Sequence, residues 1–345
     1  MILVINAGSS SIKYSLFAMP QGRAVKQGVI TGGSLFRKLE MALSGIRGVS
    51  AVGHRVVHGG EDFSRPVLIT PRVIDTIRRA AQFAPLHNPA NLKGIGVCAR
   101  ILKGAPQVAV FDTAFHQTMP EKAYIYGLPY DYYRRWGVRR YGFHGTSHEY
   151  VAREAARLLR RPLSRTNVIS CHLGNGVSVT AIRNGSCVDT SMGWTPLEGM
   201  IMGTRCGDID PSLIGYISRR GKMGLAAVYD VLNHKSGLKG VSGISNDMRR
   251  LSCAQKQGNR RAALARDIFV YRLRKYIGAY MAVLGRVDMV AFTGGIGEHH
   301  PDIRRQATRG LFANLRSRPR VAVLRACEER LIAEKAMAVL RRRIA

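Results

Sequence analysis

The amino-acid sequence predicts an α/β protein built from two sheet-centred domains. The main observation is a pair of matching strand–turn–strand units, Leu3–Phe17 and Val168–Ile182. Each has an apolar run, a turn of small polar residues, and a second strand in which apolar residues alternate. Segments with helical spacing of apolar residues alternate with short apolar runs around them, and 345 residues are enough for two domains. We therefore expect two related halves, each offering a polar turn to a shared cleft.

The elements after the first unit follow the order of an α/β fold. Residues 22–48 are rich in glycine and predict one short helix, near Leu35–Leu43. A strand is expected over 51–57. Thr70-Pro71 then starts a helix, because Thr caps it and Pro occupies its first position.

A second helix opens at Asn88-Pro89, and a buried strand over 108–111 delivers Asp112 at its carboxyl end. Ligands bind at such strand ends in open α/β sheets. Thr146 and Glu149 have the spacing of a capping box and predict that a helix follows them.

The second strand–turn–strand unit leads into a long irregular stretch, residues 189–210, whose length without helical periodicity indicates a functional loop. A long helix is expected over 261–284. A buried strand over 287–292 then enters the glycine turn Thr293–Glu298, and a helix over 327–341 closes the chain.

The charge of the chain is unusual. Fifty-three Lys and Arg residues against 22 Asp and Glu give a formal net charge of +31. A basic surface attracts polyanions, but an arginine-rich composition with solvated helix faces explains the same number. The basic residues are dispersed, and no zinc-finger, helix-turn-helix or RNA-recognition motif accompanies them. We favour the compositional explanation and expect no specific nucleic-acid partner.

Other compositional features indicate a cytoplasmic protein. The start of the chain, Met1-Ile-Leu-Val-Ile-Asn, lacks the basic region of a signal peptide, and no apolar stretch is long enough to span a bilayer, so we expect no membrane partner. Six cysteines are scattered without any Cys-x-x-Cys pair. This predicts a reduced chain without a disulfide framework or a zinc site.

Three turns rich in glycine follow apolar runs, at Asn6–Ser11, His172–Gly176 and Gly294–Gly297. Glycine lets the backbone approach a ligand closely, so the three together, with Lys13 nearby, indicate a polyphosphate held mainly by backbone N–H groups. Each turn alone is equally well an ordinary tight turn. None has the P-loop pattern or the Rossmann spacing, so a nucleotide site of another design is needed.

Two arginines stand in unusual surroundings. Arg55 lies within an apolar run, and Arg205 lies between small residues. A guanidinium presents a planar fork of donors that suits carboxylate and phosphate oxygens. A surface salt bridge explains most arginines in so basic a chain, but the apolar or glycine neighbours of these two favour a functional role.

Histidines and oxygen groups complete the candidates. His144 and His172 lie beside glycines that would admit a ligand, although most lone histidines are structural. Asp112, Asn6 and Glu328 are candidate groups for Mg²⁺, which binds oxygen ligands and keeps several waters.

Longer motifs resemble those of one enzyme family. They are residues 6–13, 53–60, 84–89, 110–120, 140–148, 172–176, 189–193, 203–211 and 292–298. In this order they resemble the acetate/propionate kinase family of the sugar kinase–Hsp70–actin superfamily. The resemblance implies two duplicated actin-like (ribonuclease H-like) domains, each a mixed sheet flanked by helices, around an interdomain cleft. One would comprise 1–114 with 329–345, and the other, 115–328, would carry most of the nucleotide site.

The resemblance also implies an activity. The enzyme would transfer the γ-phosphoryl group of ATP to acetate by reversible in-line displacement, giving acetyl phosphate and ADP. It would need Mg²⁺, with Mn²⁺ as an alternative, and would work as a cytoplasmic homodimer. Acetate is already ionised near neutral pH, since a carboxyl pKa is about 4. We therefore expect Asp112 to orient an arginine or a magnesium-bound water rather than to act as a base.

The family motifs assign a role to each candidate residue. The catalytic set is Asp112, Arg55, Arg205 and His144. The substrate set is Arg55, Val57, Leu86, Phe143 and Pro196. The nucleotide set is Ser11, Lys13, His172, Leu173, Gly174, Asn175, Gly176, Asp247, Met248, Arg249, Gly295, Ile296, Gly297, Glu298 and His299. The metal set is Asn6 and Glu328.

The chain departs from the family pattern in three ways. It is shorter than usual, and the missing material falls in residues 20–50 and 300–325. Met248 and His299 replace an aromatic residue and an asparagine, and Ala326-Cys327 replaces the usual Thr-Asn before Glu328. A propionate or other short-chain acyl kinase is the nearest alternative. A catalytically silent phosphate-loop protein, acting as a regulator or polyanion binder, is an alternative of a different class.

Overall fold

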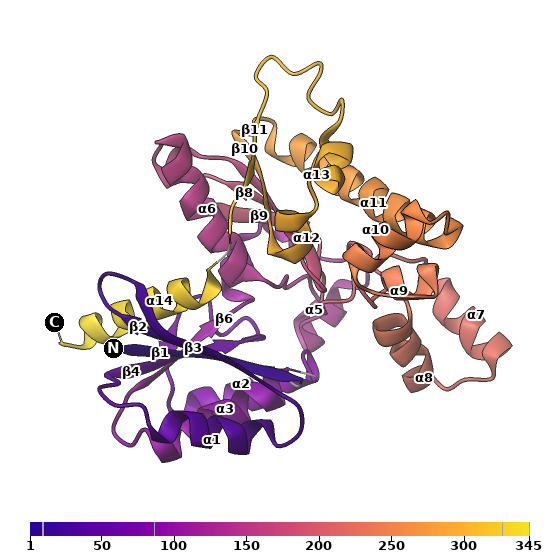
Figure 1. Cartoon of the computed structure of the whole chain (residues 1–345). Helices are drawn as coiled ribbons and strands as arrows, with labels where there is room; N and C mark the ends of the chain where they lie inside the picture. The colour runs from indigo at the N-terminus through magenta and orange to yellow at the C-terminus, as the bar shows by residue number, and fades with distance from the viewer. Residues whose placement is uncertain (9, 86, 326, 345) are drawn as a thin grey trace. The chain divides into compact units, whose positions relative to one another are not determined.

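The chain forms two units, and each unit is built around one mixed β-sheet (Figure 1). This computed structural model describes residues 1–8, 10–85, 87–325 and 327–344. The first unit comprises Met1–Gln117, Phe143–Tyr150 and Cys327–Ala345, and the second comprises Thr118–Gly142 and Val151–Ala326. Residues 115–117, 143–150 and 327–328, which the sequence analysis assigned to the second domain, thus cluster with the first unit.

The first sheet has six strands in the order β3-β2-β1-β4-β6-β5. The strands are β1 (Ile2–Ala7), β2 (Ser11–Ala18), β3 (Arg23–Thr31), β4 (Ala51–Val56), β5 (Val67–Leu68) and β6 (Gln107–Phe111). Strands β1, β4 and β6 are parallel, whereas β2 and β3 fold back antiparallel. The first predicted strand–turn–strand unit is confirmed as the hairpin β1–β2.

The second sheet repeats this plan with five strands in the order β11-β10-β7-β8-β9. The strands are β7 (Val168–Leu173), β8 (Val177–Arg183), β9 (Ser186–Thr190), β10 (Met289–Thr293) and β11 (Arg320–Val323). The meander β7-β8-β9 corresponds to β1-β2-β3, and the parallel strands β10 and β11 take the places of β4 and β6. The predicted duplication is therefore present in the strand order and direction.

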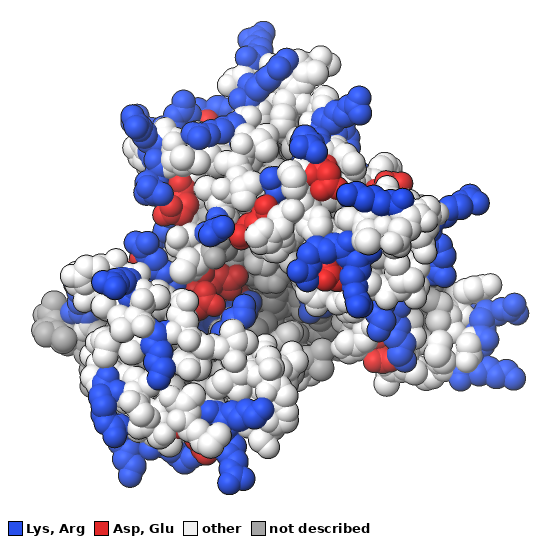
Figure 2. Space-filling model, viewed as in Figure 1, with Lys and Arg blue, Asp and Glu red and all other residues white. Residues whose placement is uncertain are grey.

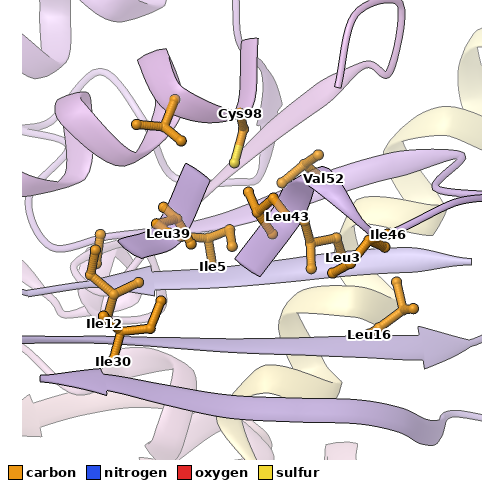
Figure 3. Close-up of a cluster of buried hydrophobic side chains, with 12 residues drawn as sticks. Leu3, Ile5, Ile12, Leu16, Ile30, Leu39, Leu43, Ile46, Val52 and Cys98 are labelled. Carbon is orange, nitrogen blue, oxygen red and sulfur yellow. The ribbon is translucent and has the colours of Figure 1, made fainter. Parts of the chain in front are cut away.

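Helices cover both faces of the first sheet. The helical segments of this unit are α1 (Leu35–Ser44), α2 (Pro71–Arg79), η1 (Ala80–Gln82), α3 (Asn88–Ile101), most of η2 (Ala114–Thr118) and α14 (Glu328–Ile344). Figure 3 shows Leu3 and Ile5 of β1 pointing toward Leu39 and Leu43 of α1. Alternate residues Ile2 and Val4 are buried on the other face, against α14. The near-continuous apolar run of β1 follows from this two-sided burial.

One glycine sets how closely α14 approaches the sheet. A Cβ built on Gly53 of β4 would lie 2.8 Å from Cγ2 of Ile332 and 3.4 Å from its carbonyl oxygen. Helix α14 therefore packs directly on the backbone of β4, and a larger residue at position 53 would push it away. This contact matters for the site because α14 begins at Glu328.

The second unit contains more helices. They are α4 (Glu121–Tyr124), α5 (Tyr130–Trp136), α6 (Gly145–Leu159, whose start belongs to the first unit), η3 (Leu163–Arg165), α7 (Ser212–Gly221), α8 (Leu225–Asp230), η4 (Val231–Lys235), α9 (Gly237–Ser242), α10 (Met248–Lys256), α11 (Arg260–Leu284), α12 (Gly294–His299) and α13 (Pro301–Thr308). None of the described helices combines the length and the apolar character that crossing a bilayer requires.

Three local predictions were wrong. Residues 22–48 include the strand β3, which the sequence analysis missed. Thr146 does not cap a helix, because α6 already begins at Gly145. Gly294–Gly297 is not a turn but the start of the short helix α12. The predicted helix start at Thr70-Pro71 is confirmed, since the Thr70 side chain accepts a hydrogen bond from the N–H of Val73.

Candidate active site

Three polar side chains lie at the carboxyl ends of the parallel strands of the first sheet. Asn6 is near the end of β1, Arg55 is near the end of β4, and Asp112 directly follows β6. The registers of β1 with β4 and of β4 with β6 place these ends side by side. This edge is where ligands bind in sheets of this kind.

Arg55 and Asp112 form a close ion pair. Nη2 of Arg55 lies 2.5 Å from Oδ2 of Asp112, and Nε donates to both carboxylate oxygens at 3.1 and 3.0 Å. Nη1 donates to Oδ1 of Asn6 at 3.3 Å. A guanidinium has five N–H groups. Counting the bonds among the described residues, one N–H on each terminal nitrogen of Arg55 is left to bind an anion.

A second carboxylate, that of Glu328, lies near Arg55 at this edge. Oε2 of Glu328 lies 3.8 Å from Nε of Arg55. Burial works against the charged form of Arg55, but the carboxylates of Asp112 and Glu328 outweigh it and raise the pKa of the guanidinium. Burial raises the pKa of Glu328 to about 6, while Arg55 and Lys13 act in the opposite direction. An additional cation would therefore stabilise the ionised form of Glu328.

The segment 143–150 supports Asp112. The hydroxyl of Thr146 donates to Oδ1 of Asp112 at 2.9 Å, and the N–H of Gly145 donates to its carbonyl oxygen at 3.0 Å. A Cβ on Gly145 would lie 2.0 Å from that oxygen, so the close approach requires glycine. His144, next in the chain, has a φ of 58° in the left-handed region. Non-glycine residues in this region cluster at functional sites.

Two buried asparagines of α3 brace the strand ends. The side chain of Asn91 accepts from the N–H of Val57 at 3.0 Å and donates to the carbonyl oxygen of Ala7 at 2.7 Å. It therefore ties the end of β4 to the end of β1. Asn88 makes matching bonds to the N–H and the carbonyl oxygen of His58 at 3.1 and 2.9 Å. The sequence analysis read Asn88 only as a helix start and did not detect Asn91.

The remaining substrate candidates lie in different parts of the chain. Val57 and Phe143 are buried in the first unit. Pro196 belongs to the second unit. Leu86 lies outside the described residues.

A cavity of about 760 Å³ opens in the second unit, within the usual size range of ligand pockets. It is lined by Gly174, Asn175, Asn246, Asp247, Met248, Arg249, Gly295, Ile296, His299 and His300. All of these except Asn246 and His300 belong to the nucleotide set of the sequence analysis. Asn246 could not be found from a glycine pattern: its Nδ2 donates to Oδ1 of Asn175 at 3.0 Å, a contact across 71 residues.

Two glycines at or near the cavity differ in the space around them. A Cβ on Gly203 would lie 2.1 Å from Oδ1 of Asn175, whereas a Cβ on Gly295 would meet no atom within 4 Å. A side chain at position 295 would therefore extend into open space. Asp247 caps α10 by accepting from the N–H of Arg249 at 2.9 Å.

The other nucleotide candidates do not line the cavity. His172 and Leu173 end β7, and Leu173 is fully buried. Gly176 and Gly297 follow in the adjoining turn and helix, and a carboxylate oxygen of Glu298 lies 3.7 Å from Arg325. Ser11 and Lys13 belong to β2 in the first unit.

Arg205 is held by the segment that carries it. Its Nη1 donates to the carbonyl oxygen of Pro196 at 3.2 Å, and burial lowers the pKa of its guanidinium. Its own carbonyl oxygen accepts from the N–H of Met202 at 3.1 Å, and the next residue, Gly203, donates to the carbonyl oxygen of Asn175 at 3.0 Å. Arg205 and the cavity residue Asn175 are thus linked by a few backbone hydrogen bonds.

The described residues include no cluster of three or more His, Cys, Asp or Glu side chains that could hold a metal. A complete protein cage for zinc or calcium would require such a cluster. Mg²⁺ does not, since it is bound by one or two carboxylates with waters and substrate phosphates. The oxygen groups of Asn6 and Glu328, both near Arg55, are suited to that mode.

Comparison with known proteins gives consistent results. A model of the acetokinase family matches residues 34–339. The acetate kinase of Halothermothrix orenii is 52% identical over 338 residues, an alignment that covers 88% of this chain and 85% of that protein.

Solved structures agree. The crystal structure of Porphyromonas gingivalis acetate kinase is 40% identical, with a TM-score of 0.92, and covers 98% of this chain and 99% of its own. A propionate kinase from Francisella tularensis is 38% identical, with the same TM-score of 0.92 and the same coverage of 98% and 99%.

Proposed function

The chain belongs to the acetokinase family, and from this premise we propose that it catalyses the reversible transfer of the γ-phosphoryl group of ATP to acetate. The products are acetyl phosphate and ADP. The observation that carries the proposal is the Arg55–Asp112 pair at the carboxyl ends of β4 and β6, with two N–H groups of Arg55 left for an anion. The mechanism is direct in-line displacement, which requires both substrates to be bound at once.

Arg55 binds the carboxylate and the transferring group through its terminal nitrogens. Phosphoryl transfer needs little covalent help from the protein and depends on positioning and on neutralising the charge of the equatorial oxygens. Arg205 and His144 contribute to the same neutralisation. Asp112 holds Arg55 in orientation through Nε and Nη2 and removes no proton, because acetate is ionised near pH 7.

ATP binds in the cavity of the second unit, where Gly174 and Gly295 let the phosphates approach the backbone. The metal is Mg²⁺, for which Mn²⁺ can substitute. Asn6 and Glu328 would hold it, and it would supply positive charge to the phosphate oxygens. The working form is a cytoplasmic homodimer.

The assay is acyl phosphate formation, trapped as the hydroxamate, from acetate, propionate and butyrate with MgATP. Acetate is expected to have the highest kcat/KM. Double-reciprocal plots of the initial rate against one substrate, at several fixed concentrations of the other, should give intersecting lines. Parallel lines would contradict direct transfer between two bound substrates.

A preference for propionate is the second candidate, supported by the equally high TM-score of the propionate kinase from Francisella tularensis. One methylene in an apolar pocket is worth only about 1–3 kcal/mol. The same assay distinguishes the two, because a higher kcat/KM for propionate would reverse the assignment.

A silent polyanion-binding protein is the alternative of another class. Figure 2 shows Lys and Arg side chains spread over the visible face rather than gathered in one patch. On this face, the distribution favours the compositional explanation of the charge over a nucleic-acid surface. Formation of no acyl phosphate, together with DNA binding that falls steeply with salt, would support the alternative.

A further inference from the structure

The irregular segment 191–211 joins β9 to α7 and carries both Pro196 and Arg205. It has no regular secondary structure, so its shape depends on side chains from other elements. Three side chains hold its first part: Tyr126 and Arg140 lie outside the segment, and Glu198 lies within it. We call them the Tyr126–Arg140–Glu198 triad.

Arg140 forms hydrogen bonds with the backbone at the beginning of the segment. Its Nη1 donates to the carbonyl oxygens of Thr190, Ser191 and Met192 at 3.0, 3.3 and 3.1 Å. Its Nη2 lies 2.5 Å from Oε1 of Glu198. One guanidinium therefore joins the start of the segment to a residue in its middle, using the planar fork that lysine lacks.

Glu198 and Tyr126 close the loop. The Tyr126 hydroxyl donates to Oε2 of Glu198 at 2.5 Å and accepts from the N–H of Trp194 at 2.8 Å. A Cβ on Gly193 would lie 1.6 Å from Oε2 of Glu198 and 2.3 Å from the Tyr126 oxygen. The backbone at position 193 thus makes room for the triad, which a larger residue would displace.

The far end of the segment is tied in the same way. Asp208 accepts from the N–H of Gly199 at 2.8 Å and from the hydroxyl of Tyr276 at 2.6 Å. Between these ties the carbonyl oxygen of Pro196 accepts from Arg205 at 3.2 Å. Any shift of Glu198, two residues after Pro196, would therefore reach Arg205 directly.

We propose that the Tyr126–Arg140–Glu198 triad is a positioning device that sets Pro196 and Arg205 for the reaction and thereby controls both rate and acyl-chain preference. The inference rests on the proposed function. The triad acts through Pro196 and Arg205 rather than as a catalytic group. It converts an irregular segment into a rigid one, and a misplacement of about 1 Å in such a site can cost roughly 10²-fold in rate.

The test uses the full chain with Glu198→Gln and Tyr126→Phe. Glu154→Gln, which removes a surface ion pair with Arg157 of 2.8 Å in the same unit, is the matched control. Glu198→Gln is expected to lower kcat by about 10-fold or more, since it misplaces Arg205. It should raise the propionate-to-acetate ratio of kcat/KM by about 3-fold or more, since it loosens the position of Pro196. Tyr126→Phe should act in the same direction with a smaller effect, and KM for ATP should be unchanged in both.

Hydrogen exchange gives a readout that does not depend on activity. Amides in 191–211 should exchange about 10-fold faster in Glu198→Gln, whereas amides of α11 should not change. Unchanged kcat, acid preference and exchange in both variants would overturn the inference. If Glu198→Gln does not fold, Tyr126→Phe decides. If the wild type forms no acyl phosphate, the proposed function fails by itself, and the exchange measurement alone decides whether the triad holds the segment.

Discussion

The two units share one strand plan but present different chemistry at the ends of their parallel strands. In the first unit these ends carry the charged or amide side chains Asn6, Arg55 and Asp112. In the second unit the ends of β7 and β10 lead into Gly174 and Gly294 and into a cavity. At the ends of these strands, the first unit therefore presents polar side chains, and the second unit presents glycine backbone.

The difference shows how the two copies of a duplicated fold can bind different chemical groups. A buried charge needs partners, and Arg55 has Asp112, Asn6 and Glu328 around it. A polyphosphate is better served by backbone N–H groups and open space, which glycine provides. Under the proposed function, the first unit acts on the carboxylate and the second on the nucleotide.

The largest effect is expected from Arg55→Ala, which removes the charge at the centre of the first unit. A stabilising arginine in phosphoryl transfer is worth about 10³–10⁵ in rate, so kcat/KM should fall at least 10³-fold. Arg78→Ala, which breaks an exposed pair with Asp75 of 2.5 Å, is the control and should leave activity unchanged. A loss of less than tenfold, in protein with a normal melting curve, would contradict the assignment of the chemistry to this edge.

Asp112→Asn tests whether the carboxylate orients Arg55 or acts as a base. Loss of orientation should lower kcat by about 10²-fold. The pH–rate profile should keep the shape of the wild-type profile, because no proton is removed. Selective loss of one limb of the profile would show that Asp112 titrates during the reaction.

Gly295→Val tests the open side of the comparison. Because a Cβ at this position meets no atom within 4 Å, the valine should extend into the cavity without disturbing the fold. KM for ATP should rise about 30-fold, with KM for acetate unchanged. Gly278→Val in α11, another position with open space, is the control. An equal rise in both KM values would mean that the two units do not divide the substrates.

The smallest change in activity is expected from His54→Gln. This substitution in the first unit tests the pH dependence of the free energy of unfolding instead. Burial lowers the pKa of His54 from 6.5 to about 4, against an opposing hydrogen bond to Gln107. As the pH falls, His54 therefore binds a proton at a higher pH in the unfolded chain than in the folded chain. The stability that the neutral His54 allows above pH 6.5 is lost as the pH falls toward 4. The loss is roughly 3 kcal/mol. Urea titrations at pH 7 and pH 5 should show a smaller difference for the variant, with wild-type activity at pH 7.

The fold could largely be predicted because its signals are local. The strands around Ile5 and Ile169 are apolar runs or alternate apolar with polar residues. A strand buried on both faces of its sheet is wholly apolar, and one buried on a single face alternates. Strand β3 could not be predicted, because it is an edge strand whose side chains are mostly exposed and carry no apolar period. Thr146 and Glu149 mimic a capping box, but their side chains serve tertiary contacts to Asp112 and Lys335.

The site was only partly accessible from sequence. Arg55 and Asp112 could be singled out, because a charge beside an apolar strand is conspicuous. Asn91 and Glu198 could not, since their partners lie 34 or more residues away and nothing in their neighbourhood is unusual. Their importance depends on which backbone groups the fold brings to them.

The packing of α14 on β1 and β4 has a consequence for the synthesis of the chain. Ile2, Val4 and Val108 are buried by a helix that starts only at Glu328. Until α14 has been made, one face of the first sheet has no cover, although residues 151–325 of the second unit precede α14 in the chain. Domains generally fold as units during synthesis, so the second unit is the one that can be completed first. Glu328, one of the two residues proposed to hold the metal, belongs to that helix, so a nascent chain has no complete site until α14 has been made.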